Sequence, residues 1–261
     1  MFSVMSRVFI VCCAVALAAC ERRIILPTES TPPAPTVTGM TIAGSASLRT
    51  EQSELFTADV RLSNGTTGSL PLPTWSSSDE SVASVTELGI VTANRQGTAT
   101  ILASAQGVVA QTPLQVWQNY HGTWIGTFTV RKCAASGAFI AQGFCSTFSL
   151  GTLLPFVLTL MQDQGTAAGT LTLSNLSGAI QGGIFSNRHF VGHGSQSALI
   201  DGIEFSSKIG TFDVLADSAA EGYLVTEITS PAVAGSGYVE AGVASLTRVS
   251  YTAQVAAPAG R

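Results

Sequence analysis

The feature that most constrains the fold is a two-residue alternation of apolar and polar side chains, which recurs along the chain after residue 36. In LFTADVRLS, Phe56, Ala58 and Val60 alternate with polar neighbours, and Ala99 and Ile101 do so in TATILAS. A strand places successive side chains on opposite faces, whereas a helix repeats its apolar face every 3.6 residues. Short alternating runs separated by glycine and asparagine turns therefore predict an all-β chain of sandwich or barrel type.

The N-terminal segment breaks this pattern because it is a short, uninterrupted apolar run. Arg7 is the only charge before Cys20, and VFIVCCAVALAA separates the two. Such a run is too short to span a bilayer and is typical of a signal peptide. Its end, Leu17-Ala18-Ala19-Cys20, resembles the lipobox of bacterial lipoproteins. The alternative is an ordinary signal peptide in which Cys20 is incidental.

The lipoprotein resemblance implies a location for the protein. It predicts a signal peptide over residues 1–19, acylation of Cys20 and anchoring in a lipid bilayer, since several acyl chains on one residue hold a protein stably. Glu21 rather than aspartate follows the cysteine, which favours the outer membrane by analogy with enteric lipoproteins. Residues 20–36 contain ILPTESTPPAP, whose prolines predict an extended linker between the membrane and the first domain.

The remaining cysteines predict a disulfide. The chain has five cysteines, of which Cys12 and Cys13 leave with the signal peptide and Cys20 carries lipid. Cys133 and Cys145 remain as an even pair in an exported chain, where oxidising conditions favour a disulfide. Two free thiols are the alternative.

Charge and composition exclude some classes of partner. The formal net charge is −4, and no basic patch gives the electrostatic footprint of a nucleic-acid-binding protein. No later segment is long and apolar enough for a transmembrane helix. No phosphate-binding loop or dinucleotide-binding fingerprint occurs, so we expect no cofactor.

Residues 37–117 resemble the bacterial immunoglobulin-like group 2 domain. The resemblance rests on Trp-Ser-Ser-Ser-Asp at 75–79, Ser-Val-Ala-Ser-Val at 81–85, a glycine turn at Gly89, and Gly-Thr-Ala-Thr-Ile at 97–101. It implies a β-sandwich that acts as a spacer or contact module and brings no catalytic residues. As the one large aromatic in the middle of this segment, Trp75 is expected to fill the core.

Residues 118–261 are predicted to form an antiparallel meander that closes into a β-barrel of eight or nine strands, since closure removes exposed edges. HGTWIGTF, at 121–128, resembles the opening strand of lipocalins and other calycins. That resemblance implies that Arg248, on the last strand, packs over Trp124 at one end of the barrel. An open meander or sandwich is the alternative. An outer-membrane barrel is disfavoured because girdle aromatics are too few.

The nine candidate strands of this region are 123–132, 153–162, 168–175, 179–186, 188–194, 199–206, 208–216, 222–229 and 243–252.

Candidate catalytic groups are sparse. His189 and His193 share a strand face but lie roughly 13 Å apart, too far to bind one metal ion. A triad of Ser195, His193 and Asp213 lacks the glycine-flanked turn that presents a nucleophilic serine. Two carboxylate pairs, Asp201 with Glu204 and Asp213 with Asp217, are more simply explained as solvated turns. We therefore expect no enzyme and no metal site.

These observations favour a non-enzymatic, membrane-anchored envelope lipoprotein involved in adhesion or other contacts. In this interpretation the immunoglobulin-like domain presents a barrel that binds an envelope protein, a glycan or a small apolar ligand. The alternative is a lipocalin-like carrier with a small molecule inside the barrel. A hollow apolar interior would favour the carrier, and a core filled by Phe128, Phe156, Leu158, Leu171, Leu173 and Phe212 would count against it.

Overall fold

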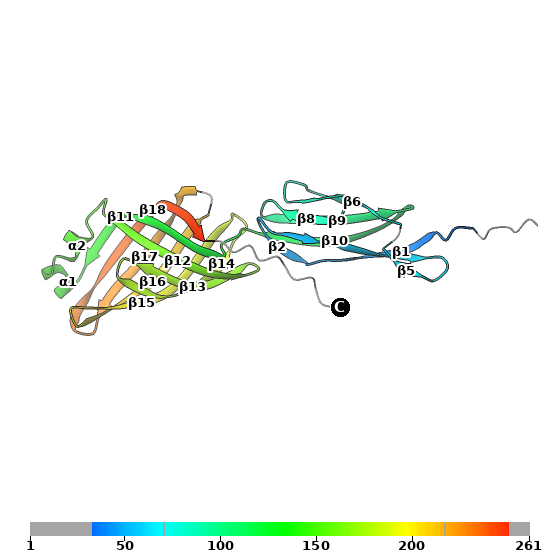
Figure 1. The fold of residues 1–261 in the computed structure, drawn as a ribbon. Helices are drawn as coiled ribbons and strands as arrows, with labels where there is room; N and C mark the ends of the chain where they lie inside the picture. Colours follow the sequence, from blue (N-terminus) through cyan, green and yellow to red (C-terminus); the bar gives the residue numbers. More distant parts are fainter. Residues whose placement is uncertain (1–32, 70, 217, 251–261) are drawn as a thin grey trace, which may run out of the picture. The chain divides into compact units, whose positions relative to one another are not determined.

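The computed structural model describes residues 33–69, 71–216 and 218–250, so Cys20, the rest of the leader and Asp217 lie outside the described residues. The described residues from Pro35 to residue 250 belong to a single compact unit. Strands dominate the described residues, which fold as an immunoglobulin-like domain followed by a closed barrel (Figure 1). No helix among the described residues is long and apolar enough to cross a membrane.

Three small sheets build the first domain, with strand orders β1-β4-β5, β2-β10-β9-β6 and β3-β8-β7. The strands are β1 (Val37–Ala43), β2 (Ser47–Arg49), β3 (Ser53–Leu55), β4 (Thr57–Leu62), β5 (Thr67–Gly68), β6 (Thr74–Ser77), β7 (Ala83–Val85), β8 (Ile90–Ala93), β9 (Gly97–Ala105) and β10 (Val108–Trp117). Alternating residues of these strands supply the core, in which Phe56, Ile101 and Val116 are almost completely buried.

Trp75 contributes to this core from its border. It packs against the buried cluster but stays only partly buried, whereas Phe56 is the fully buried aromatic. The reason is topological, because Trp75 lies on β6, which is the edge strand of its sheet. Gly89 leaves room for the indole, since an added Cβ there would lie 3.1 Å from the ring.

Eight antiparallel strands close into the barrel of the second domain. They are β11 (Gly122–Ala135), β12 (Leu153–Asp163), β13 (Thr166–Leu173), β14 (Leu176–Ile184), β15 (His189–Ile200), β16 (Ile203–Leu215), β17 (Ser218–Ser230) and β18 (Val233–Ser250). Each strand pairs with the next along the chain, and β18 pairs with β11 to close the ring. The predicted fold class, a sandwich followed by a meander barrel, is thus confirmed.

The predicted strand boundaries were partly wrong. Segments 199–206 and 208–216 were separated in the prediction, but the turn falls at Asp201-Gly202, where both residues have positive φ, and β16 runs unbroken from there. The last strand begins at Val233 rather than near residue 243. The second error involves glycine, because Gly235 and Gly237 lie inside β18 although glycine in a sequence often signals a turn.

Glycines that face the barrel interior allow neighbouring strands to approach closely. An added Cβ on Gly182 would overlap the carbonyl oxygen of Val191, and one on Gly194 would overlap that of Ala179. Residues with side chains could not occupy these positions without moving the strands apart. Sharp bending at such points lets a sheet of eight strands curl into a narrow barrel.

An insertion between β11 and β12 carries the only two helices of the described residues, α1 (Ala138–Ala141) and α2 (Phe144–Thr147). Cys145 in α2 forms a disulfide with Cys133 in β11, with their Cα atoms 5.7 Å apart. Phe139, Phe144 and Phe148 of the insertion pack with residues from the ends of the neighbouring strands, namely Leu176, Ile228 and Val233. The insertion therefore adds a small second apolar cluster beside the main core, and the disulfide links this insertion covalently to β11.

Candidate functional site

One end of the barrel is built around Trp124 and Arg248. Strand register places the two residues opposite each other on β11 and β18. The guanidinium carbon of Arg248 lies 4.6 Å from the Trp124 ring centroid, so the structure contains the contact expected from the sequence. The buried indole Nε1 donates a hydrogen bond of 2.9 Å to the Tyr120 carbonyl oxygen.

Arg248 is held from its other side as well. Its Nη2 donates to the carbonyl oxygen of Asn119 at 3.1 Å, and its Nη1 pairs with a Glu51 carboxylate oxygen at 2.6 Å. A planar guanidinium can stack on a ring and donate from its edge at the same time. The residue therefore combines ring stacking with polar contacts, which a lysine could not reproduce.

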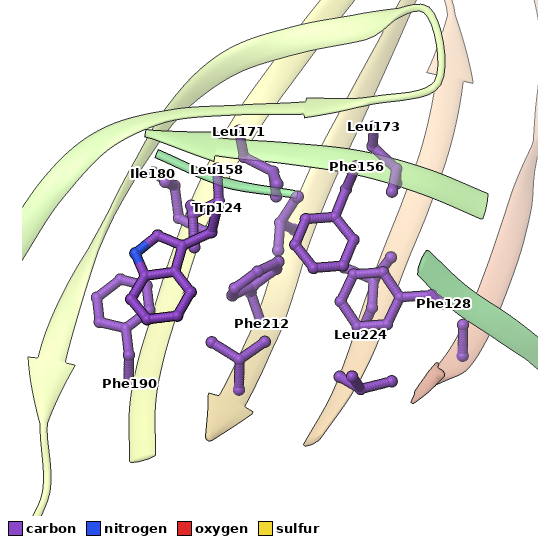
Figure 2. Close-up of a cluster of buried hydrophobic side chains, with 14 of the residues drawn as sticks. Trp124, Phe128, Phe156, Leu158, Leu171, Leu173, Ile180, Phe190, Phe212 and Leu224 are labelled. Carbon is purple, nitrogen blue, oxygen red and sulfur yellow. The ribbon is translucent and has the colours of Figure 1, made fainter. Parts of the chain in front are cut away.

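The barrel interior is filled by large side chains. Alternation along β12 buries every second residue, from Leu154 to Gln162. Phe128 and Phe156 lie with ring centroids 4.6 Å apart, and Phe212 meets both rings edge-on. Figure 2 shows these rings gathered with the labelled leucines between the strands. Other members of the same buried cluster include Trp124, Leu158, Leu171, Leu173, Ile180, Phe190 and Leu224.

This packing bears on the carrier hypothesis. Phe128, Leu158, Leu171 and Phe212 are each 0 % exposed, which leaves no surface for a ligand to contact. An interior ligand site needs an apolar cavity of several hundred cubic ångströms, and here the same space is occupied by protein side chains. The filled interior excludes a preformed lipocalin-like cavity.

His189 and His193 occupy different settings on β15. His189 Nδ1 lies 2.5 Å from Asp213 Oδ1, and His189 Nε2 lies 3.4 Å from a carboxylate oxygen of Glu221. His193 lies at the register shift between Gly192 and Gly194 and pairs with Gln181 on the neighbouring strand. Register pairs Asp213 with Val191, and its carboxylate meets the nearby His189 rather than His193.

No catalytic triad results from this arrangement. Among the described residues, no hydrogen bond joins His193 to Ser195 or to Asp213. Both ring nitrogens of His189 face carboxylates, so neither is positioned to take a proton from a hydroxyl nucleophile. Asp201 and Glu204 are both exposed, and the described part of the chain holds no group of three or more side chains arranged to bind a metal ion.

His121 has a perturbed protonation equilibrium. Burial lowers the pKa of its imidazole, and the positive charges of Arg49 and Arg248 lower that pKa further. Its Nδ1 is buried without a hydrogen-bond partner. The neutral ring is therefore the form that the folded state favours.

Two grooves lie on the outer face of the barrel. The first has a volume of about 420 Å³ and crosses β11, β12, β13 and β18, with Ile125, Pro155 and Val157 among its lining residues. The second has a volume of about 720 Å³ and crosses β13 to β17. Its outward-facing lining side chains are Ala168, Ala179, Gln181, His193, Ser195, Ser206, Lys208 and Thr229. Sequence reasoning missed both grooves, because they depend on which strands become neighbours.

Comparison with known families identifies the first domain. Residues 36–116 match the family described as bacterial Ig-like domain (group 2). The match confirms the resemblance inferred from the tryptophan, serine and glycine motifs, and it ends before the barrel begins. A search of curated proteins found no match.

Solved structures of a surface-layer protein show a remote similarity. Domains 5-6 of the S-layer protein SbsC are 12 % identical, with a TM-score of 0.30, and the alignment covers 79 % of this chain and 98 % of that one. Domains 4-9 are 11 % identical, with a TM-score of 0.30 and coverage of 79 % and 31 %. The structure of rSbsC(31-844) is 12 % identical, with a TM-score of 0.29 and coverage of 84 % and 41 %. The chain thus spans less than half of the two longer structures, and similarity at these scores carries no argument about function.

Proposed function

We propose that this protein is a non-enzymatic envelope lipoprotein, anchored through Cys20, whose immunoglobulin-like domain presents a solid barrel that binds through its outer surface. The resemblance of residues 36–116 to the bacterial Ig-like family implies a contact module, and His189, whose ring nitrogens both face carboxylates, is not placed to act as a general base. The proposal assigns contact, rather than chemistry, to the barrel.

The filled barrel interior is the observation that carries this proposal. A side-chain core of Phe128, Phe156 and Phe212 leaves the outer face as the surface available to a partner. Opening the interior to a ligand would require displacing these rings and losing their packing, at a cost of several kcal/mol. The lipid anchor and the proline-rich linker over residues 20–36 would hold this outer face away from a membrane.

Metabolic labelling with radioactive palmitate tests the anchor. We expect the wild-type chain to incorporate label and to fractionate with membranes, and globomycin to block its processing. A Cys20→Ala variant should lose the label, whereas the matched Cys13→Ala variant should keep it, because Cys13 lies in the part of the leader that is removed. Equal labelling of both variants, or none in the wild type, would show that the anchor is absent.

A further inference from the structure

The larger outer groove is lined by polar side chains whose hydrogen-bonding groups face solvent. Register places Ala168, Gln181 and His193 side by side on β13, β14 and β15, and Ser195 opposite Lys208 on β15 and β16. Small residues between longer polar ones make this face concave. Within the described residues, no hydrogen bond occupies the side chains of Gln181, His193 or Ser195. The groove thus offers amide, imidazole and hydroxyl groups to a ligand.

The smaller groove combines an apolar floor with hydroxyl-bearing walls. Ile125 and Val157 form part of its lining and remain 45 % and 42 % exposed. Hydroxyl side chains surround them, namely those of Thr127, Thr172, Ser174, Ser245 and Thr247. A ligand that suits this groove has both apolar C–H surface and hydroxyl groups.

A row of hydroxyl side chains joins the two grooves around the outside of the barrel. Cross-strand register pairs Thr172 with Ser177, Ser177 with Ser197, Ser197 with Ser206, and Ser206 with Thr229. Thr172 belongs to the smaller groove, and Ser206 and Thr229 belong to the larger one. Neighbouring strands lie about 4.8 Å apart, so the row spans roughly 19 Å with one hydroxyl on each strand. A single exposed hydroxyl side chain on a strand is common. Here five hydroxyl side chains on five neighbouring strands lie in register and connect the two grooves.

The scarcity of charged residues in the two grooves restricts the class of ligand that they can bind. Lys208 is the only lysine or arginine in the larger groove, and strand register sets it opposite Glu227. The smaller groove has no ionisable side chain among its lining residues. A polyanion such as nucleic acid or a sulfated polymer would find no matching positive charge here. An extended neutral polymer rich in hydroxyl groups fits both the charge and the length of the row.

We propose that the two grooves and the hydroxyl row form one binding track for an extended, neutral glycan chain. The sugar hydroxyl groups would exchange hydrogen bonds with Ser177, Ser197 and Ser206, and a C–H face of the chain would lie on Ile125 and Val157. This inference rests on the proposed function, because it names the ligand class of the outer surface that the function requires.

Titration of the purified full chain with chitohexaose tests the track, with detergent present if the chain carries lipid. We expect backbone amide resonances of β13 to β17 to shift on titration. The Ser197→Arg substitution should weaken binding about tenfold or more, because the long charged side chain blocks the row. Ser206→Arg is an independent second variant in the larger groove. Thr98→Arg, on an exposed position of β9 in the immunoglobulin-like domain, is the matched control and should leave affinity unchanged.

Two further glycans and one polyanion complete the test. Binding of cellohexaose or maltohexaose that is weakened by the same variants also supports a neutral-glycan track and tells which linkage it prefers. Failure of all three oligosaccharides to bind at millimolar concentration overturns the inference, as does stronger binding of heparin or equal loss in the Thr98→Arg control. None of these outcomes depends on acylation of Cys20, so they are distinguishable from failure of the anchor.

Discussion

Arg248 lies over the indole ring of Trp124, with its guanidinium carbon 4.6 Å from the ring centroid, where the last strand of the barrel pairs with the first. The two residues are more than a hundred positions apart in the sequence, yet their contact lies on the seam that closes the ring. Stacking and hydrogen bonding by one side chain thus stabilise barrel closure at this end.

Replacing Arg248 with methionine tests the energetic value of this contact. Methionine keeps an unbranched apolar stem but removes the charge, so we expect the free energy of unfolding to fall by about 1–3 kcal/mol in urea. The matched control is Lys132→Met, since Lys132 lies 5.3 Å from the Tyr238 ring on an exposed part of the surface. Exposed pairs contribute little, and equal losses in the two variants would contradict a special role for Arg248.

Replacing both Cys133 and Cys145 with serine should destabilise the barrel by about 2–3 kcal/mol, because the disulfide closes a short loop in the unfolded chain. Guanidinium unfolding under oxidising conditions measures the loss. Addition of a reductant should lower the stability of the wild type to that of the double variant and leave the variant unchanged. A wild type that is insensitive to reductant would show that the bond contributes nothing to stability.

Truncating Phe128 to alanine should cost about 3–5 kcal/mol, because its ring is completely buried between Phe156 and Phe212. Thermal unfolding followed by circular dichroism measures the change. Phe185, which is 55 % exposed, provides the control, and Phe185→Ala should change stability by less than about 1 kcal/mol.

The same variant distinguishes a solid barrel from a carrier. The wild type should not bind a small apolar fluorophore, whereas Phe128→Ala creates space in the core and is expected to bind it weakly. Tight binding of apolar molecules to the wild type, lost on bulky substitution inside the barrel, would favour the carrier and contradict the proposed function.

The pH dependence of stability should carry a contribution from His121. The pKa of this residue is lower in the folded chain than its ordinary value near 6.5, chiefly because burial disfavours the charged ring. The unfolded chain therefore binds the proton first as pH falls, so this contribution is complete above about pH 6.5 and is lost as pH decreases towards the folded pKa.

Urea unfolding midpoints between pH 7.5 and 5.5 measure that contribution. The wild type should lose more stability over this range than His121→Gln, in which the titrating group is absent. If the two proteins lost stability equally over this pH range, His121 would bind its proton with the same affinity in the folded and the unfolded chain, which would contradict the prediction.

Much of the architecture could be predicted from local sequence. Alternation in LLPFVLTLMQD predicts a strand with Leu154, Phe156 and Leu158 on one face, and all three are buried. Motifs around Trp75 and Gly97 predicted the immunoglobulin-like domain, which the family match confirms. These predictions succeed because turn residues and two-residue periodicity act within a few positions of the chain.

Features that depend on register could not be predicted in the same way. Pairing of β15 with β16 places Asp213 opposite Val191, where its carboxylate meets His189 rather than His193. Gly182 and Gly194 lie inside long strands at points where the backbones of neighbouring strands approach closely. Such outcomes depend on pairing between strands, which no short segment specifies.

The sequence by itself determined that apolar and polar side chains alternate as they do in strands, and that the first domain is immunoglobulin-like. It also placed Trp124 on the first strand and Arg248 on the last strand of a meander. Only the tertiary structure decided that eight strands close with their aromatic faces inward, that the interior is full, and that hydroxyl groups from five strands lie in register on the outside. The physical reason is that periodicity assigns each side chain to a face of its own strand, whereas ring closure and bulges decide what that face contacts.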